Sequence, residues 1–404
     1  MTVERRGWVC CHLGAREHYA VPRALHRRGS LAHLVTDAWA PPGAWYPQGG
    51  VLGRLAQRYH GELADAPIRA LTGSLIGHEL LWRVRRRAGW DLLIARNEWF
   101  QERAAAALRA LPAEHPVVFA HSYSAASILR EAKQRGSTTV LGQIDPGPRH
   151  YRLQEQLSGE YPEYGPASAA PPPSYFDHWR RECDAADHIV VNSEWSRDSL
   201  VEAGSDAAKI AIIPLPYEPD RDATSQPRVY PDAFSAARPM RVLFVGAASV
   251  VKGAADLLEA FASLADPRME LHLVGDRVMS VPARIARHPG IHWIGPVDRM
   301  RVMEYYRTSD VLVFPSHSDG FGMAQVEACA WGLPIIASRN CGAVVDNERT
   351  GLLLDVVSPA SLAAALRRIV DQPSLLAHFS NGMHHESTFG LDRFADMLMS
   401  LEAR

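Results

Sequence analysis

Residues 311–338, VLVFPSHSDGFGMAQVEACAWGLPIIAS, contain the pattern that most restricts how this chain can fold. An apolar run at Val311–Phe314 is followed by a glycine-bearing turn, by a helix-like stretch that stops at Gly332, and by a second apolar run. This order predicts a strand, a loop, a helix and a second strand. Such a βαβ unit belongs in a parallel sheet and binds ligands at the carboxyl end of its first strand.

Two carboxylates flank this turn and helix. Asp319 lies in the turn, and Glu327 lies among the apolar residues of the predicted helix. A carboxylate in apolar surroundings is costly unless it is paired or hydrogen-bonded. The vicinal hydroxyls of a ribose can each donate to one carboxylate oxygen, whereas pairing with an arginine for structural reasons is the alternative. The Gly320-Phe321-Gly322 backbone offers N–H groups where the helix dipole favours an anion.

The full context, S-x-x-D-G-F-G-x-x-x-x-E-A-x-A-x-G-x-P, resembles the signature of the retaining, GT-B-fold glycosyltransferases of family 4. That signature is Glu, seven residues and Glu around a GFG turn, and here Asp319 replaces the first Glu. The resemblance implies an α/β chain with the GT-B fold: two facing Rossmann-like domains, with a C-terminal helix that crosses back to the N-terminal domain. It also implies that Glu327 holds the ribose of a UDP- or GDP-linked sugar. Asp319 would then contact the donor sugar, beside Met323 and the amides of Gly320, Phe321 and Gly322.

A second strand, loop and helix pattern runs from Met240 through Gly246 to a helix predicted over Ala254–Leu264. Lys252 in its loop places a compact cation where a diphosphate would collect. The chain has only three lysines among its 43 basic residues, which favours a functional role for this one. It matches the K-G of the family pattern V-G-R-x-x-x-x-K-G, in which the usual Arg is Ala247 here. The resemblance implies that Lys252 stabilises the negative charge on the leaving diphosphate.

Five further candidates lie where predicted strands end. Gly14 follows the first strand and, like Gly246, is a donor-binding candidate, because its turn lets the backbone approach a ligand closely. Without a G-x-G-x-x-G fingerprint it does not indicate a dinucleotide. Backbone groups at Gly275 and Ile294 would frame the nucleobase of the donor. His121 and Asp145 are catalytic candidates on the acceptor side of the cleft, although a surface histidine and simple loop capping remain open for them.

The length of 404 residues is too great for one ordinary core, so two domains of about 200 residues each are expected. We assign residues 1–215 to an N-terminal, acceptor-binding Rossmann-like domain and 216–238 to a linker without periodicity. Residues 239–385 form the sugar-nucleotide-binding Rossmann-like domain in this interpretation. Residues 386–404 form the crossover helix.

Composition limits which binding partners and which cellular compartment are expected. Hydrophobic residues at 47% and charged residues at 22% are typical of a globular protein, and a net charge of −2 gives no reason to expect nucleic acid as a partner. No apolar run approaches a membrane span, the N-terminus lacks a signal-peptide core, and the five cysteines are scattered. We therefore expect a cytoplasmic protein with reduced thiols.

No metal and no cofactor are expected. No cysteine spacing suggests zinc. Asp220-Arg221-Asp222 is similar to the Asp-x-Asp metal motif of the other main glycosyltransferase fold, but that motif needs a rigid strand end to hold a cation. In a linker, solvated charge is the simpler interpretation.

Four stretches of the first half have weaker patterns. A helix is predicted over Glu17–Arg28, and a strand over Asp91–Ala95 followed by an Ala-rich helix through Ala110. Residues 79–90 are basic and amphipathic, which permits weak peripheral contact with anionic lipid or simply marks a solvated helix face. Ser158–Ser174, rich in Pro, Gly and Ala, is interpreted as a flexible flap or acceptor loop.

The resemblance as a whole predicts a glycosyltransferase that moves a sugar from a sugar nucleotide to an acceptor hydroxyl of unknown identity, with retention and without metal. No nucleophile on the other face of the sugar is evident, which favours a front-face route in which the leaving phosphate takes the acceptor's proton. An epimerase of the same fold and a non-catalytic sugar-nucleotide-binding protein stay open, the latter because of Ala247 and Asp319. A phosphorylase would need a pyridoxal-bearing lysine, for which only Lys133 and Lys209 are spare.

Overall fold

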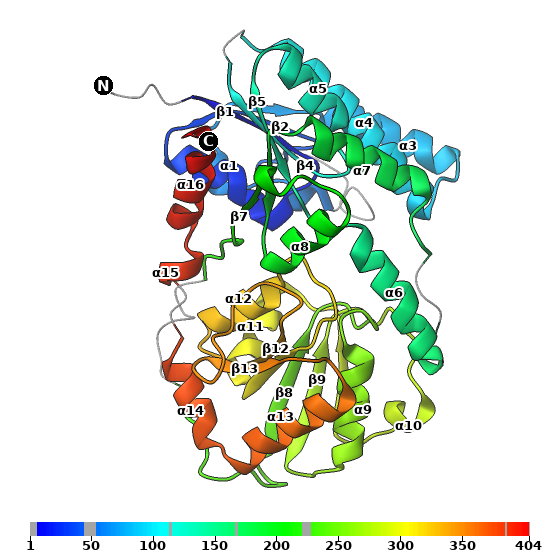
Figure 1. Cartoon of the computed structure of the whole chain (residues 1–404), viewed down its shortest axis with the longest axis vertical. Helices are drawn as coiled ribbons and strands as arrows, with labels where there is room; N and C mark the ends of the chain where they lie inside the picture. Colours follow the sequence, from blue (N-terminus) through cyan, green and yellow to red (C-terminus); the bar gives the residue numbers. More distant parts are fainter. Residues whose placement is uncertain are drawn as a thin grey trace.

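The structure is a computed structural model that describes residues 6–43, 54–112, 115–165, 169–219, 228–383 and 386–403. Its described strands form two separate parallel sheets, stacked one above the other along the long axis of the molecule (Figure 1). Each sheet is accompanied by helices, as expected when parallel strands are joined by crossover connections. The fold class predicted from the sequence is therefore confirmed.

The N-terminal sheet has the order β3-β2-β1-β4-β5-β6-β7. Its strands are short, and the central ones are buried along their length, which is why they appear in the sequence as continuous apolar runs. They span Trp8–His12 (β1), Leu31–Thr36 (β2), Ile68–Ala70 (β3), Val117–His121 (β4), Thr138–Gly142 (β5), His188–Val191 (β6) and Ile210–Ile212 (β7). The accompanying helices are α1 (Ala20–Arg27), α3 (Thr72–Val84), α4 (Gly89–Arg109), α5 (Ala126–Gln134), α7 (Pro173–Ala185) and α8 (Glu194–Glu202).

The C-terminal sheet has the order β10-β9-β8-β11-β12-β13. Its strands span Met240–Val245 (β8), Met269–Val274 (β9), Ile291–Gly295 (β10), Val311–Phe314 (β11), Ile335–Ser338 (β12) and Gly351–Leu354 (β13). The helices are α9 (Ala254–Leu264), α10 (Ala283–Ala286), α11 (Arg299–Thr308), α12 (Met323–Ala330), α13 (Pro359–Asp371) and α14 (Ser374–Asn381). The predicted strand–loop–helix–strand unit over residues 311–338 is thus β11, its loop, α12 and β12.

The chain ends against the N-terminal domain. After α14, the short helix α15 (Glu386–Phe389) leads to α16 (Leu391–Met399), which lies beside α1 (Figure 1). Phe394 and Leu398 of α16 are buried in the same hydrophobic cluster as Trp8 of β1, and the indole N–H of Trp8 donates to Glu402 at 2.6 Å. The apolar face of α16 therefore completes the N-terminal core.

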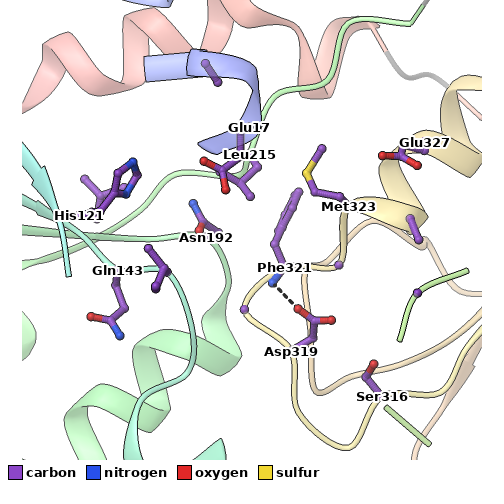
Figure 2. A pocket seen from close by; sticks show the side chains of 18 of the residues that line it. Glu17, His121, Gln143, Asn192, Leu215, Ser316, Asp319, Phe321, Met323 and Glu327 are labelled. Carbon is purple, nitrogen blue, oxygen red and sulfur yellow. Dashed lines mark hydrogen bonds between the residues drawn. The ribbon is translucent and has the colours of Figure 1, made fainter. Parts of the chain in front are cut away.

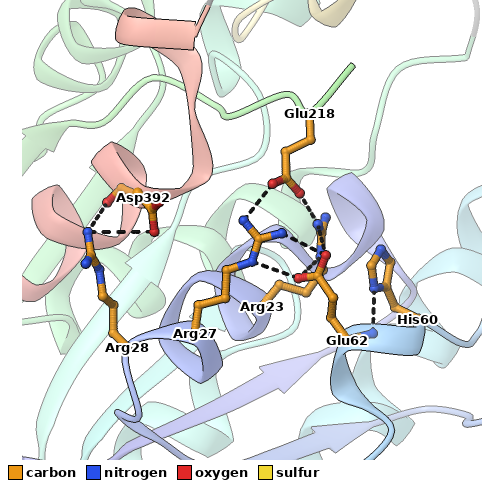
Figure 3. Close-up of polar contacts among 7 residues, drawn as sticks. All are labelled: Arg23, Arg27, Arg28, His60, Glu62, Glu218 and Asp392. Atoms are coloured by element: carbon orange, nitrogen blue, oxygen red, sulfur yellow. Dashed lines mark hydrogen bonds and ion pairs between the residues drawn. The ribbon is translucent and has the colours of Figure 1, made fainter. Parts of the chain in front are cut away.

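Ion pairs hold the interdomain segment beside α1 (Figure 3). Glu218 accepts from the guanidinium groups of Arg23 and Arg27, and Glu62 accepts from the same two arginines. Arg23 is buried, so this pairing satisfies a charge that would otherwise be costly. The first residues after β7 are thereby tied to the N-terminal domain.

A second connection runs between the domains through α6 (Pro148–Glu160) and the short 3₁₀ turn Pro162–Tyr164. Figure 1 shows α6 leaving the N-terminal domain and extending along the C-terminal one. The hydroxyl of Tyr161 donates to Asp256 of α9 at 2.5 Å, and that of Tyr164 donates to Glu259 at 2.7 Å. The expected flexible flap is therefore wrong for residues 158–165, because two aromatic side chains anchor them, while residues 166–168 lie outside the described residues.

Two predictions of secondary structure in the first half are also wrong. Asp91–Ala95 is not a strand but the beginning of α4, in which Ala95 and Trp99 are buried one helical turn apart. The helix expected from Glu17 begins only at Ala20, because Glu17, His18 and Tyr19 have positive φ angles and form a separate tight turn.

Truncation of the crossover helix should destabilise the N-terminal domain. Replacing Phe394, which is 3% exposed, by Ala leaves a cavity between α16 and β1 and should cost about 3–5 kcal/mol of unfolding free energy. Urea denaturation followed by tryptophan fluorescence would measure it. Asp396→Ala on the exposed face of the same helix is the control and should cost under about 1 kcal/mol; equal losses would contradict this packing.

Candidate active site

Two adjoining cavities lie between the domains, at the carboxyl ends of both sheets. The first has a volume of about 380 Å³ and the second about 700 Å³. Both are lined by Glu17, Ala20, Val245, Met323 and Glu327, so these residues mark the passage from one cavity to the other. The volumes are those of small-molecule sites, and Figure 2 shows side chains of both domains directed into one cavity.

Most of the predicted donor-binding residues of the C-terminal domain line the first cavity. They are Gly246, Lys252, Asp319, Gly320, Phe321, Gly322, Met323 and Glu327. They come from the β8–α9 loop, from the β11–α12 turn and from α12 itself. The structure thus brings together two motifs that are more than 60 residues apart in the sequence.

Lys252 and Asp319 form an ion pair within this group. The ammonium donates to one carboxylate oxygen of Asp319, and the other oxygen accepts from the backbone N–H of Phe321 at 3.3 Å. Gly253 has φ +69°, and a Cβ there would overlap the carbonyl of Pro315. Glycine at this position therefore lets the lysine loop approach the turn that carries Asp319.

Glu327 lies near the start of α12, and its partner is a tyrosine. The hydroxyl of Tyr306 donates to Oε2 of Glu327 at 2.7 Å, whereas Oε1 has no hydrogen-bond partner within the described ranges. Burial raises the pKa of Glu327, and the Tyr306 hydrogen bond and the charge of Arg299 partly oppose that shift. No salt bridge to Glu327 is found in the part of the chain that the structure describes. One carboxylate oxygen thus remains available to a ligand in either cavity.

The remaining candidates of the C-terminal domain do not line either cavity. Gly275 donates its N–H to Gly295 and packs so closely on Gly246 that a Cβ would overlap the carbonyl there. Ile294 packs with the hydrophobic cluster that contains Tyr306. The side chains that line the second cavity beyond β10 are instead those of Val297, Arg299, Val302 and Met303.

Two candidates of the N-terminal domain have local structural contacts. Gly14 has φ +88° and donates its N–H to the buried Asp37 at 3.0 Å. One oxygen of Asp145 accepts from the hydroxyl of Tyr123 at 2.8 Å, from Gln143 at 3.1 Å and from the N–H of Gly147 at 2.8 Å. These bonds hold the β5–α6 loop, and neither residue lines a cavity.

His121, the remaining candidate, lines the first cavity and contacts a second histidine. The rings of His121 and His12 meet edge to face with centroids 4.5 Å apart. All four of their ring nitrogens are buried and have no hydrogen-bond partner among the described residues. Burial lowers the pKa of His12 to about 3 and that of His121 well below its ordinary value, so both rings are neutral at neutral pH.

Three polar residues of the N-terminal domain that line the first cavity were missed by the sequence reasoning: Glu17, Gln143 and Asn192. Gln143 and Asn192 directly follow β5 and β6, which was the available signal, since strand ends face the cleft. Glu17 gave no signal, because it reaches the cavity only through its left-handed backbone conformation. Burial raises its pKa, with the charge of Arg16 opposing.

The turn that carries Asp319 also contacts the N-terminal domain. The hydroxyl of Ser318 lies 3.2 Å from Nδ1 of His150 and accepts from the indole N–H of Trp195 at 3.1 Å. The carbonyl of Gly320 accepts from the hydroxyl of Ser193 at 2.7 Å. These bonds close the cleft around the first cavity. The Asp220-Arg221-Asp222 motif considered for metal lies outside the described residues.

Comparison with known proteins agrees with this geometry. Residues 239–372 match the family model described as Glycosyl transferases group 1. This part of the chain is therefore similar to the group 1 glycosyltransferases. The group 1 region contains β8 to α13, and with them Lys252, Asp319 and Glu327.

The curated relatives match only part of this chain. A D-inositol 3-phosphate glycosyltransferase 2 of Catenulispora acidiphila is 31% identical over 228 residues, which are 51% of this chain and 53% of that protein. A D-inositol 3-phosphate glycosyltransferase of Streptomyces bingchenggensis is 29% identical over 233 residues, 52% of this chain and 51% of that one. The chain spans about half the length of the curated relatives it matches.

Solved structures match nearly the whole chain in fold. Anabaena Alr3699/HepE in complex with UDP has a TM-score of 0.62 at 14% identity and covers 98% of this chain and 99% of that one. Sucrose-phosphate synthase from Thermosynechococcus elongatus has a TM-score of 0.64 at 19% identity, with 98% of each chain covered. At these identities the likeness shows the fold, which is GT-B.

The buried histidine pair should make the protein sensitive to acid. Because the folded-state pKa of His12 is about 3 and its ordinary pKa is 6.5, the unfolded state binds more protons between these values. The stability that neutral His12 permits is therefore present above pH 6.5 and is lost as the pH falls toward 3. His12→Phe should flatten the pH dependence of the melting temperature in this window, measured by scanning fluorimetry, while the exposed-site control His378→Gln should not.

Proposed function

We propose that this protein transfers a sugar from a nucleotide diphosphate sugar to an acceptor hydroxyl, with retention of the anomeric configuration and without a metal ion. The observation that carries this proposal is the placement of Glu327 and Lys252. Glu327 lies at the passage between the two cavities with one carboxylate oxygen unpaired among the described residues, and Lys252 lies in the wall of the first cavity. A diol and a diphosphate, as found in one nucleotide, satisfy these two groups together.

The second cavity suits the nucleoside half of the donor. Ribose hydroxyls would donate to Glu327, while the base would lie between Val297, Val302 and the aliphatic part of Arg299. This arrangement replaces the frame expected from Gly275 and Ile294. UDP is the first nucleotide to test, because structural neighbours of 14% and 15% identity were crystallised with UDP and with UDP-glucose.

The first cavity suits the diphosphate and the sugar. Lys252 supplies a positive charge there, and the N-terminus of α12 begins at Gly322 on the cavity wall. Ala247 stands at the position of the phosphate-binding Arg in the family pattern. Lys252 would therefore have to neutralise more of the negative charge that grows on the leaving group. Asp319, now paired with Lys252, would hydrogen-bond the sugar once a diphosphate competes for the lysine.

The acceptor would enter from the N-terminal domain. His121, Gln143 and Asn192 offer neutral hydrogen-bonding groups to a hydroxylated acceptor in the first cavity. No carboxylate of the N-terminal domain other than Glu17 lines that cavity within the described residues, which supports the front-face route in which the leaving phosphate takes the acceptor's proton. The names of the curated relatives make a phosphorylated cyclitol the first acceptor to assay.

Substitution of the two anchoring residues should separate nucleotide binding from catalysis. Glu327→Gln should weaken UDP binding, because an amide accepts only one of the two ribose hydrogen bonds. Lys252→Ala should lower turnover by about tenfold or more, because a charge at the leaving group is lost. Calorimetry with UDP and mass spectrometry of the transfer product measure these effects. Lys133→Ala, which removes a lysine paired with Asp187 outside the cavities, is the matched control.

The outcomes distinguish the competing functions. Wild-type activity in both variants would contradict the site. Release of an isomerised sugar nucleotide without acceptor would show an epimerase, and tight UDP binding without any transfer or hydrolysis would show a sensor.

The basic segment 79–90 supports a proposal of peripheral contact with anionic lipid. None of the helices within the described residues is long and apolar enough to span a bilayer. At the end of α3, however, Leu80 and Val84 are 55% and 80% exposed beside Arg83 and the two exposed arginines Arg85 and Arg86. An apolar strip edged by cations fits the interface of an anionic membrane.

Vesicle cosedimentation tests this contact. The protein should pellet with anionic vesicles at low salt and not with neutral ones, because the arginines need anionic headgroups. Val84→Asp should reduce pelleting severalfold, while Val229→Asp, at another exposed valine, should not. Absence of pelleting with anionic vesicles would contradict the proposal.

A further inference from the structure

A cluster of three potential metal ligands lies in the C-terminal sheet, apart from both cavities. Glu270 and His272 of β9 and His292 of β10 place one ligand atom each within 4.8 Å of one another. None of the three lines a cavity. It is the one trio of His, Cys, Asp or Glu with this spacing in the ranges that the structure describes.

Sheet geometry brings the three side chains together. Glu270 and His272 are two residues apart on β9 and so point to the same face. His292 is the register partner of His272 on β10, which is the edge strand of the sheet. In the sequence the three residues appear as E-x-H followed by a histidine 20 residues later, which is not a known metal-binding signature. They come together only because β9 and β10 are paired.

The distances suit a small divalent ion. Nε2 of His272 lies 3.2 Å from Oε1 of Glu270, and Nε2 of His292 lies 3.9 Å from Oε2. In a tetrahedral zinc site, bonds of about 2.0–2.2 Å put neighbouring ligand atoms about 3.4 Å apart. Each of the three side chains would therefore have to shift by less than about 1 Å to place its ligand atom on one shared ion.

The surroundings hold the carboxylate of the trio in place and, within the described residues, leave one imidazole nitrogen unpaired. Nε of Arg241 donates to Oε1 of Glu270 at 2.7 Å, and ligating carboxylates are commonly held by such a bond. Nδ1 of His272 is buried and has no partner in the described part of the chain. His292 remains 42% exposed, which leaves a path by which an ion could enter.

We propose that Glu270, His272 and His292 form a zinc-binding site that is separate from the donor site. Two imidazoles and one carboxylate favour Zn²⁺ over Mg²⁺ or Ca²⁺, which prefer oxygen ligands only. Water would complete the coordination from the open side of β10. Because the site joins β9 to the edge strand β10, bound zinc would fasten that edge of the sheet.

Equilibrium dialysis of the chain without a polyhistidine tag, against buffered micromolar Zn²⁺, tests the proposal. About one ion per chain should bind, and His292→Gln, at the most exposed ligand, should weaken binding by about tenfold or more. His378→Gln is the control, since His378 is an exposed histidine of the same domain. It should bind zinc as the unchanged chain does.

Three further measurements keep the test independent of folding and of the donor site. Zinc should raise the melting temperature of the unchanged chain and not of His292→Gln, since a ligand that binds only the native state stabilises it. Cobalt should give visible absorption bands that His292→Gln lacks. UDP binding should be equal in all variants. Absence of saturable zinc binding, or binding that His292→Gln leaves unchanged, would overturn the proposal.

Discussion

The close packing of the β11–α12 turn against two neighbouring loops is the constraint on which the candidate site depends. A side chain at Gly253 would overlap the carbonyl of Pro315, and one at Gly342 would overlap Phe321. Only because both positions are glycine can the lysine loop approach the turn and bring Lys252 to Asp319. The charges of the site are therefore positioned by backbone contacts, and the ion pair follows from them.

The same turn connects the two domains. Ser318 and Gly320 are hydrogen-bonded to residues of the N-terminal domain, and α6 and α16 connect the domains at two further places. A ligand that displaces Asp319 from Lys252 acts on a segment that also touches the opposite domain. A donor bound as proposed would therefore contact the segment that also joins the two domains.

In the part of the chain that the structure describes, three polar side chains in or beside the first cavity have polar atoms without a partner. His12 and His121 have unpaired ring nitrogens, and Glu327 has an unpaired oxygen, among the described residues. Such groups cost stability unless a ligand or water satisfies them. A ligand in the first cavity could satisfy His121 and Glu327, because both line it.

The sequence by itself determined the fold class, the strand–loop–helix units around Lys252 and Glu327, and the limits of α9, since these depend on local periodicity and turn chemistry. It failed at Asp91–Ala95, where an apolar run suits either a strand or a helix until packing decides between them. Only the tertiary structure showed that Asp145 caps its own loop, that Glu17 reaches the cavity, and that Glu270 meets two histidines. The physical reason is that these facts depend on which strands pair and how two domains face each other, and no local pattern records that.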